Sequence, residues 1–494
     1  TQARTRLSCK SNIMTFTTVL IAVFIFLLTA LWFHLNRFRS YVYSLGIPVD
    51  RRIWWRYQKV SFTQLMEEQL RNYGKLFVEY DSTVPFIVIA EPELIKEVMV
   101  KHFDSFTNRQ EFGVEDRHAS LVDARDDIWA KTRKALSPTF TSGKLKGMTS
   151  YMDKVASTMI DHLEDTIKTK GPIVNIKEVF QMLSLDTIGH CAFGIDTNSF
   201  KNPENELLKR CFRAFNDLMI KDTTESFFFN ILKFFPGLAR YIDLYGKENY
   251  DWLRNMTKTI ADNRKESRND FIDRLNELNA DQAKHHLSEE VIMAQGIAFF
   301  IAGYETTSNT LSTLCYNLAK NPEVQEKVYE EISRVTEEND GLINHETTNQ
   351  MPYLEATIEE DLRIHPPVLS LDRECSKDTK IGDLMIKKGV NVLFPIWALH
   401  HSEDFFQDPK EFRPERFLKE TKEDFHPYAY LPFGGGPRKC IGLRFAMIEM
   451  KLALAKLLQK YRIVAVPETK LDFFNGDVFL LSYPEVKVKL ETRE

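Results

Sequence analysis

The sequence has few cysteines and no pattern that would pair them. Its six cysteines are scattered over 494 residues, without a Cys-x-x-Cys motif or the dense spacing of a secreted disulfide scaffold. We therefore expect a reducing compartment. The chain also lacks an excess of basic residues, because its formal net charge is −5. A nucleic-acid partner is therefore not expected.

The sequence also lacks internal boundaries. After residue 60 there is no Pro/Gly/Ser-rich linker, low-complexity run or internal repeat. Hydrophobic residues make up 43% of the chain and include 36 phenylalanines, which is enough material for a large core. We therefore predict one catalytic domain, residues 37–494, preceded by an N-terminal segment, residues 1–36.

One long run without formal charge stands near the N-terminus. Residues 15–35 contain no Asp, Glu, Lys or Arg, and as a helix they would be about 31 Å long, close to the thickness of a bilayer core. A cleaved signal peptide is the alternative, but the run is long for one and no small-residue cleavage site follows it. The sequence thus predicts a transmembrane anchor. The arginines after the run favour a cytoplasmic catalytic domain, and a start at Met14 would remove residues 1–13.

A lone cysteine stands in a glycine-rich loop that leads into a helix. Residues 433–442 read Phe-Gly-Gly-Gly-Pro-Arg-Lys-Cys-Ile-Gly, and apolar positions recur at helical spacing from Leu443 onward. The free amides of that helix, with Arg438 and the basic residues beside it, would favour the Cys440 thiolate. The glycines would let a flat ligand lie close to the backbone. We expect Cys440 to ligate a metal; a buried structural cysteine is the alternative.

A second unusual segment stands inside a long predicted helix, residues 288–320, for which Ser288 is the expected N-cap. Residues 302–307 read Ala-Gly-Tyr-Glu-Thr-Thr, although glycine and paired threonines lower helix propensity. The Thr306 hydroxyl can donate to the carbonyl four residues earlier, and the glycine would leave open space beside it. The segment predicts a small groove, and a buried helix with a tolerated glycine is the alternative.

Together these motifs carry a resemblance to a known family. The pattern Phe-x-x-Gly-x-Arg-x-Cys-x-Gly, filled by Phe433, Gly436, Arg438, Cys440 and Gly442, resembles the haem-ligand signature of the cytochrome P-450 superfamily. The helix segment resembles the family's oxygen-binding motif. The likeness runs from about residue 44 to the end and is strongest to the microsomal animal clan of drug- and steroid-oxidising monooxygenases. It implies a mainly α fold with a small β subdomain and an N-terminal transmembrane helix.

The resemblance also implies roles for individual residues. Cys440 would be the metal ligand of haem b, and Thr306 and Glu305 would supply protons to dioxygen. The expected cofactor-binding residues besides Cys440 are Arg438, Trp129, Arg133, Arg373, Phe433 and Ala302. Guanidinium groups suit the propionate carboxylates of haem.

A charged triad is implied in the same way. Glu360 and Arg363 lie three residues apart on a helix predicted to start near Pro352, so they can pair, and a surface ion pair is the ordinary interpretation. With the Pro-Glu-Arg-Phe segment at residues 414–417, they resemble two family motifs. The resemblance implies a buried structural triad of Glu360, Arg363 and Arg416 under the haem loop.

The substrate pocket is less well marked. An aromatic stretch at residues 227–236 lies where relatives carry the lid of the pocket, and it is also a candidate for dipping into the membrane. The candidate lining residues, by position only, are Phe300, Ile301, Ala302, Val368, Leu369, Ser370, Phe479 and Leu480. Their apolar character predicts a lipophilic substrate.

The implied function is monooxygenation of lipophilic small molecules of xenobiotic, steroid or fatty-acid type. No Gly-x-Gly-x-x-Gly follows a predicted strand, so electrons from NADPH would come through a separate flavoprotein reductase, with cytochrome b5 as a further candidate donor. A basic face would suit an acidic electron donor, and the candidate residues for it are Lys131, Lys134, Lys144, Lys146 and Lys439. The alternative is that these lysines are merely solvated and bind no partner.

The expected location is the endoplasmic reticulum membrane, with the catalytic domain on the cytoplasmic side. Two other functions compete with monooxygenation. One is a haem-thiolate isomerase or dehydratase acting on lipid peroxides, and the other is a catalytically silent haem-binding membrane protein. The Glu305-Thr306 pair argues against both.

Overall fold

The computed structural model describes most of the chain after residue 37. The described ranges are 38–51, 61–81, 84–110, 120–202, 204–218, 247–282, 286–421, 423–472 and 480–493, with a few isolated positions between 24 and 36. The predicted anchor therefore lies largely, and the aromatic stretch 227–236 wholly, outside the described residues. Within the described ranges, no helix combines the length and apolarity needed to cross a membrane.

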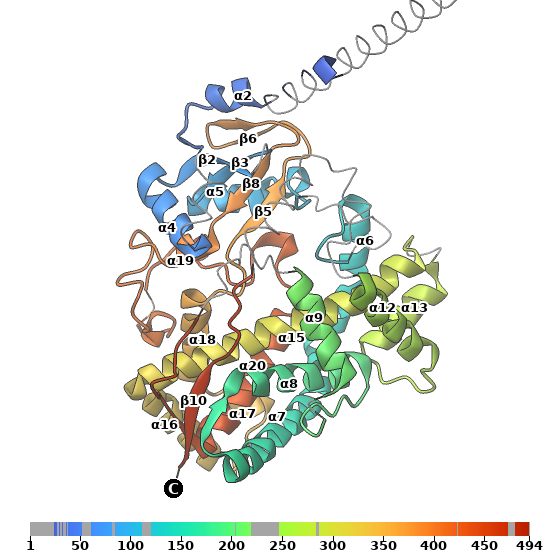
Figure 1. Ribbon diagram of the computed structural model, residues 1–494, viewed down its shortest axis with the longest axis vertical. Helices are drawn as coiled ribbons and strands as arrows, with labels where there is room; N and C mark the ends of the chain where they lie inside the picture. Colours follow the sequence, from blue (N-terminus) through green and yellow to red (C-terminus); the bar gives the residue numbers. More distant parts are fainter. Residues whose placement is uncertain are drawn as a thin grey trace, which may run out of the picture.

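The long predicted helix forms the axis of the molecule. It is α15 (Glu289–Lys320), and the side chain of Ser288 accepts a hydrogen bond from the Val291 amide at 3.4 Å, which confirms the predicted N-cap. Most of its side chains are buried, as expected for a helix that is apolar on several faces. It packs against helices on several sides, namely α8 (Ile176–Ile188), α9 (Glu206–Leu218), α12 (Lys247–Asp262), α13 (Phe271–Ala280), α18 (Pro352–Ile364) and α20 (Leu443–Lys460). Figure 1 shows α15 crossing the body of the protein among them.

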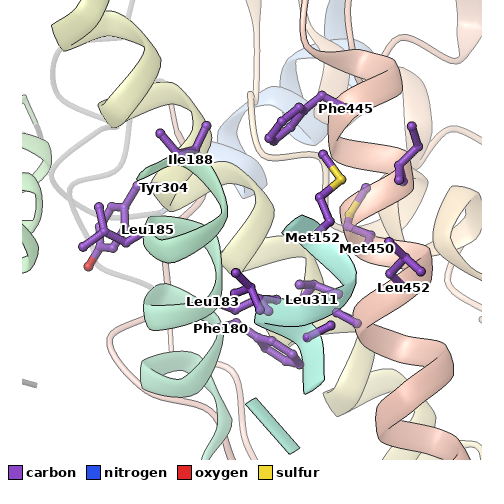
Figure 2. Packing of buried hydrophobic residues seen from close by; sticks show 14 of the residues in the cluster. Met152, Phe180, Leu183, Leu185, Ile188, Tyr304, Leu311, Phe445, Met450 and Leu452 are labelled. Atoms are coloured by element: carbon purple, nitrogen blue, oxygen red, sulfur yellow. The ribbon is translucent and has the colours of Figure 1, made fainter. Parts of the chain in front are cut away.

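The main core lies where α15, α8 and α20 meet α7 (Ser142–Lys170). Figure 2 shows buried side chains from these four helices packed together, among them Met152, Phe180, Leu311 and Met450. The remaining described helices of the body and periphery are α2 (Arg39–Ser44), α4 (Phe62–Tyr73), α5 (Pro92–Lys96), α6 (Asp126–Leu136), α16 (Pro322–Glu338), α17 (His345–Thr348) and α19 (Ile396–His400).

The strands form small sheets beside the helices. One sheet has five strands in the order β1-β2-β3-β8-β5, with bounds Val49–Asp50, Leu76–Asp81, Val84–Ile89, Asn391–Phe394 and Leu371–Glu374. β3 pairs parallel with β8, and β5 pairs antiparallel with β8 so that Arg373 faces Val392 in register. In Figure 1 this sheet lies at the end of the molecule that carries α2. The mainly α fold with a small β part is thus confirmed.

Two smaller sheets complete the described β structure. β10 (Lys487–Thr492) pairs antiparallel with both β4 (Ile173–Asn175) and β9 (Tyr461–Val464). β6 (Thr379–Ile381) and β7 (Leu384–Ile386) form an antiparallel hairpin. β9 directly follows α20, so the C-terminal sheet fixes the far end of the helix that begins beside Cys440.

Candidate functional site

The loop before α20 holds Cys440 by its backbone. The Cys440 amide donates to the carbonyl of Phe433 at 2.9 Å, which closes the loop. Gly436 has φ 65°, and a Cβ there would lie 2.1 Å from the carbonyl oxygen of Met99. No other residue fits this position, because the loop turns directly against the backbone of η1 (Glu97–Lys101). This glycine therefore serves a close approach between two chain segments, which the sequence alone did not predict.

The thiol of Cys440 faces the interior of the protein. Its side chain is exposed, yet burial raises the pKa of the thiol. The amide of Gly442 opposes this rise, as do the charges of Arg133 and Arg109. The guanidinium of Arg438, which is expected to favour the thiolate, donates hydrogen bonds to the backbone carbonyls of Val122 and Ala124. An exposed group that is nevertheless desolvated lies on an enclosed space inside the protein.

Three arginines converge near the cysteine loop, namely Arg109, Arg373 and Arg438. Arg373 and Arg438 are 1% and 6% exposed. Burial and the charge of Arg109 lower the pKa of Arg438 to about 8 and that of Arg373 to about 9. Among the described residues, the Nε atoms of all three arginines are buried without a hydrogen-bond partner. Buried cations with free donors are costly unless an anion meets them. The cluster therefore fits a ligand that carries carboxylates, such as the propionates of haem.

The backbone and ring contacts of Arg438 fix its position. Its Nη2 donates to the carbonyl of Ala124 and its Nη1 to that of Val122 at 3.4 Å. The guanidinium lies 4.8 Å from the ring centroid of Trp129 on α6. The sequence had grouped Trp129 with Arg133. The structure stacks Trp129 on Arg438, while Arg133, like Arg109, acts on Cys440 through its charge.

Sequence analysis did not assign a role to Arg109. Its carbonyl accepts a hydrogen bond from Arg125 at 2.6 Å, and Arg125 in turn pairs with Glu374 at 2.7 Å. These contacts join segments far apart in the chain, so no local motif indicates them. The position of Arg373 does have a local cause, because β5 holds its backbone in the five-stranded sheet.

The middle of α15 carries an exposed alanine and a partly exposed threonine. The Thr306 hydroxyl donates to the Ala302 carbonyl at 2.6 Å, which confirms the predicted bond. Ala302 is exposed in the middle of a largely buried helix, so it lies on an enclosed space. The prediction of open space beside Gly303 is wrong, because a Cβ at this position would lie 2.4 Å from Cδ1 of Ile188. The glycine instead allows α8 and α15 to pack closely.

The candidate lining residues divide into two groups. Phe300 is fully buried, with its ring centroid 3.8 Å from that of Phe193, so it belongs to the core. Leu369 and Ser370 are also buried. Val368 and Leu480 are partly exposed and pair with each other in an isolated β-bridge. The predicted lining residue Phe479 lies outside the described residues.

Glu305 is part of a buried polar network. Lys177 on α8 lies 2.6 Å from its Oε1, and Ser482 donates to the same oxygen at 3.0 Å. Gln181 donates to Oε2 at 3.1 Å. The carboxylate thus faces α8 and the C-terminal segment. Its contact with Lys177 was not predicted, because the helical pattern of α8 does not indicate which side chain a buried lysine will contact.

The predicted triad is present and buried. Arg363 forms two hydrogen bonds of 2.8 Å with Glu360, and Arg416 Nε lies 3.2 Å from the same carboxylate. His400, which sequence analysis missed, links the triad to the loop. Its Nε2 accepts the Leu431 amide at 2.9 Å, and its Nδ1 donates to the Arg363 carbonyl at 3.0 Å. Burial lowers the pKa of His400 well below its usual value, so the neutral ring can keep both bonds.

Comparisons with known proteins agree with this geometry. The family model described as Cytochrome P450 matches residues 47–490. Cytochrome P450 3A29 of Sus scrofa is 37% identical over 81% of each chain, and Cytochrome P450 3A7 of Homo sapiens is 35% identical over 98% of each chain. Lithocholate 6-beta-hydroxylase of Mesocricetus auratus is 35% identical over 81% of each chain. The match spans the cysteine loop, the central helix and the triad, and the chain belongs to the cytochrome P450 family.

Proposed function

We propose that this protein inserts one oxygen atom of O2 into lipophilic small molecules of xenobiotic or steroid type, with NADPH as the electron source through a separate flavoprotein reductase. Membership of the family makes the chain a haem-dependent oxidoreductase with monooxygenase chemistry. One observation carries the proposal for the site: the Cys440 thiol and the Thr306 segment both carry exposed surface, and three arginines near the cysteine loop have buried Nε atoms without a hydrogen-bond partner.

The residues present fit haem b. Cys440 would hold the iron, and Arg109, Arg373 and Arg438 would receive the two propionates, with Trp129 supporting Arg438. When bound, the haem would supply the activation of O2, and the Cys440 thiolate as its ligand would favour cleavage of the O–O bond. Phe433 orients the ligand through its hydrogen bond with the Cys440 amide. The chain therefore provides the ligand, the propionate partners and a desolvated environment.

Proton supply is assigned to α15. The Thr306 hydroxyl is held by the Ala302 carbonyl and is partly exposed, so it would hold a proton that the reduction of O2 can use. Glu305 would act less directly, because its carboxylate is held by Lys177, Gln181 and Ser482. A hydroxyl placed for proton delivery favours monooxygenation over a haem-thiolate isomerase, which rearranges peroxides without added protons.

The substrate class is proposed from the relatives and the site together. The name of the Mesocricetus auratus relative indicates hydroxylation of lithocholate, a steroid acid, by that protein. Partly exposed apolar residues of this chain, Ile301, Val368 and Leu480, support a lipophilic substrate.

The redox partner and the membrane location are also proposals. Of the basic residues suggested for reductase or cytochrome b5 docking, Lys131 pairs with Asp127 at 3.3 Å and Lys146 with Glu346 at 3.2 Å. Partner binding would therefore have to compete with these exposed pairs, which are weak. Residues 1–36 are proposed to anchor the domain, residues 37–494, to the cytoplasmic face of the endoplasmic reticulum.

The test uses the haem-loaded enzyme. The reduced, carbon-monoxide-bound protein is expected to show the red-shifted Soret band of a thiolate ligand, and Cys440→His is expected to lose it. Cys315→Ala, which removes a buried thiol from α15, is the matched control and should keep the band. Hydroxylation of a lipophilic substrate that requires both NADPH and reductase supports the proposal. Rearrangement of a lipid peroxide without NADPH would replace it with the isomerase function.

A further inference from the structure

The position of Lys177 is not explained by the helix that carries it. Lys177 is the second residue of α8 and is buried. The N-terminal end of a helix carries partial positive charge, so a lysine in the first turn is unfavourable unless an anion lies beside it. A buried ammonium group also needs hydrogen-bond acceptors. The reason for a lysine at this position therefore lies in its contacts with other elements.

The anion that Lys177 meets is the Glu305 carboxylate of α15. Its Nζ lies 2.6 Å from Oε1 of Glu305, and both side chains are buried. Gln181, one turn further along α8, donates to Oε2 at 3.1 Å. Within the part of the chain that the structure describes, no second lysine or arginine forms a salt bridge with Glu305. The charge of this carboxylate is therefore balanced by Lys177.

The ammonium group of Lys177 is held from three sides. Besides Glu305 it donates to Oδ1 of Asn309 at 3.0 Å and to Oγ of Ser308 at 3.4 Å. An ammonium group has three hydrogens, so each of them has an acceptor. Asn309 is itself fixed, because its amide group donates to the carbonyl of Leu481 in the C-terminal segment. The cation is thus held in place, and with it the carboxylate that it binds.

The charge state of Glu305 matters for the proposed reaction, because that reaction takes up a proton: RH + O2 + NADPH + H+ → ROH + H2O + NADP+. The competing reaction, O2 + NADPH + H+ → H2O2 + NADP+, yields no product. A group that passes protons must be able to accept one, which a carboxylate can do and a protonated acid or an amide cannot. Glu305 directly precedes Thr306, and its partner Gln181 is partly exposed. The carboxylate therefore has a hydrogen-bonded link to accessible surface on the side away from Thr306.

We propose that Lys177 is a positioning residue for proton delivery, because it keeps the Glu305 carboxylate ionised and turned toward Gln181. This inference rests on the proposed function, in which Thr306 and Glu305 supply protons. Lys177 itself acts only through Glu305. Without the cation, a carboxylate buried to this degree takes up a proton and becomes neutral. A variant that lacks the cation is therefore expected to behave like Glu305→Gln.

The first test follows the protonation of Glu305 without any turnover. Infrared spectra of the haem-loaded proteins are compared at neutral pH in the region of protonated carboxyl groups. Lys177→Met is expected to gain a carbonyl band that the double variant Lys177→Met/Glu305→Gln lacks. Lys177→Arg keeps the positive charge and should not gain the band. If Lys177→Met does not fold, Lys177→Gln, which lacks the charge but keeps a donor, answers the same question.

A lysine with an exposed partner provides the matched control. Lys451 on α20 is 5% exposed and lies 3.2 Å from Glu355, whose side chain is 47% exposed. In Lys451→Met the partner carboxylate stays hydrated, so no band is expected. Absence of the band from both Lys177→Met and Lys177→Gln, or its persistence in the double variant, would overturn the inference.

The second test compares two oxidants on a lipophilic substrate that wild type oxidises, with lithocholate as the first probe. NADPH with reductase needs a proton from solvent, whereas cumene hydroperoxide does not: RH + R′OOH → ROH + R′OH. Lys177→Met is expected to lower product per NADPH about two-fold or more, with more hydrogen peroxide, while its yield from the hydroperoxide stays within about two-fold of wild type. Lys177→Arg should restore product per NADPH. In a Thr306→Ala background the same substitution should change it little, because the step is already lost.

The outcomes separate the inference from the proposed function. Equal loss of product with both oxidants in Lys177→Met would show a merely structural lysine and overturn the inference, although the function would stand. Additive losses in Lys177→Met and Thr306→Ala would do the same. If the infrared band appears in Lys177→Met but wild type oxidises no lipophilic substrate with NADPH and reductase, the proposed function fails, and with it the role of Lys177 in proton delivery.

Discussion

The Nζ atom of Lys177 lies 2.6 Å from Oε1 of Glu305, and their side chains are only 2% and 4% exposed. Burial lowers the pKa of Lys177, while the charge of Glu305 opposes that shift. Lys177 also donates to Asn309 at 3.0 Å, one turn along α15. The pair therefore fastens α8 to α15 beside the Thr306 segment, and the position of the proposed proton donor depends on it.

We expect substitutions of Lys177 and Glu305 to have coupled effects on the free energy of unfolding. Lys177→Met leaves a buried carboxylate and Glu305→Gln a buried ammonium group, so each is expected to cost about 3–5 kcal/mol. The double variant leaves neither charge, and its loss should be well below the sum of the single losses. Denaturant unfolding of all four proteins measures the coupling. Additive losses would show that the two side chains do not depend on each other.

Thr306→Ala is expected to waste electrons. Without the hydroxyl the site would lose a proton donor, so NADPH oxidation should continue while product per NADPH falls and hydrogen peroxide rises. Glu305→Gln should show a similar but smaller effect. Thr310→Ala removes the same hydroxyl one turn further along, from a side chain only 2% exposed, and should keep coupling near wild type. Full coupling in Thr306→Ala would refute the assignment.

Arg363→Ala is expected to yield protein that does not retain haem. The variant leaves Glu360 buried without its bidentate partner, at a cost of about 3–5 kcal/mol, and it also breaks the bond from Arg363 to the His400 carbonyl at 2.8 Å. Haem content per polypeptide and the melting temperature measure the effect. Arg334→Ala, from an exposed pair with Glu338, is the control and should change stability by less than about 0.5 kcal/mol. Normal haem content in Arg363→Ala would contradict a structural triad.

Features with a local cause could be predicted from the sequence. Ser288 caps α15 through a contact three residues away, and the Thr306 hydroxyl bonds the carbonyl four residues earlier. The start of α20 at Leu443 follows from apolar periodicity. Each of these depends on neighbours within one helical turn, so the pattern of residue types contains the necessary information.

Features with a tertiary cause could not be predicted. Gly303 meets Ile188, Glu305 meets Lys177 and Phe300 stacks on Phe193, all across an interface between α15 and residues on or after α8. No spacing in one segment indicates which side chain of another will lie opposite. Arg109 and His400 were missed for the same reason, since each acts through a partner far along the chain.

Glu449 is expected to make the stability of the protein depend on pH. It lies on α20 and is 2% exposed. Burial raises its pKa from 4.5 to about 8, a rise that the neighbouring Ser184 and Thr187 hydroxyls only partly offset. The folded state therefore keeps a proton that the unfolded chain releases near its ordinary pKa. The contribution of Glu449 to the free energy of unfolding is accordingly largest below pH 4.5. It falls as the pH rises from 4.5 to about 8, by about 1.4 kcal/mol per pH unit for one proton.

Glu449→Gln removes this titration and preserves the shape of the side chain. We expect the melting temperature of the variant to fall less than that of wild type between pH 5.5 and 8, with the variant the more stable of the two at the upper end. Glu338→Gln, at an exposed position, is the control and should follow wild type. Asp361, whose pKa burial raises to about 8, stays in all three proteins, so its contribution cancels in the comparison. Parallel curves for wild type and Glu449→Gln would mean that Glu449 is ionised in the folded protein at neutral pH.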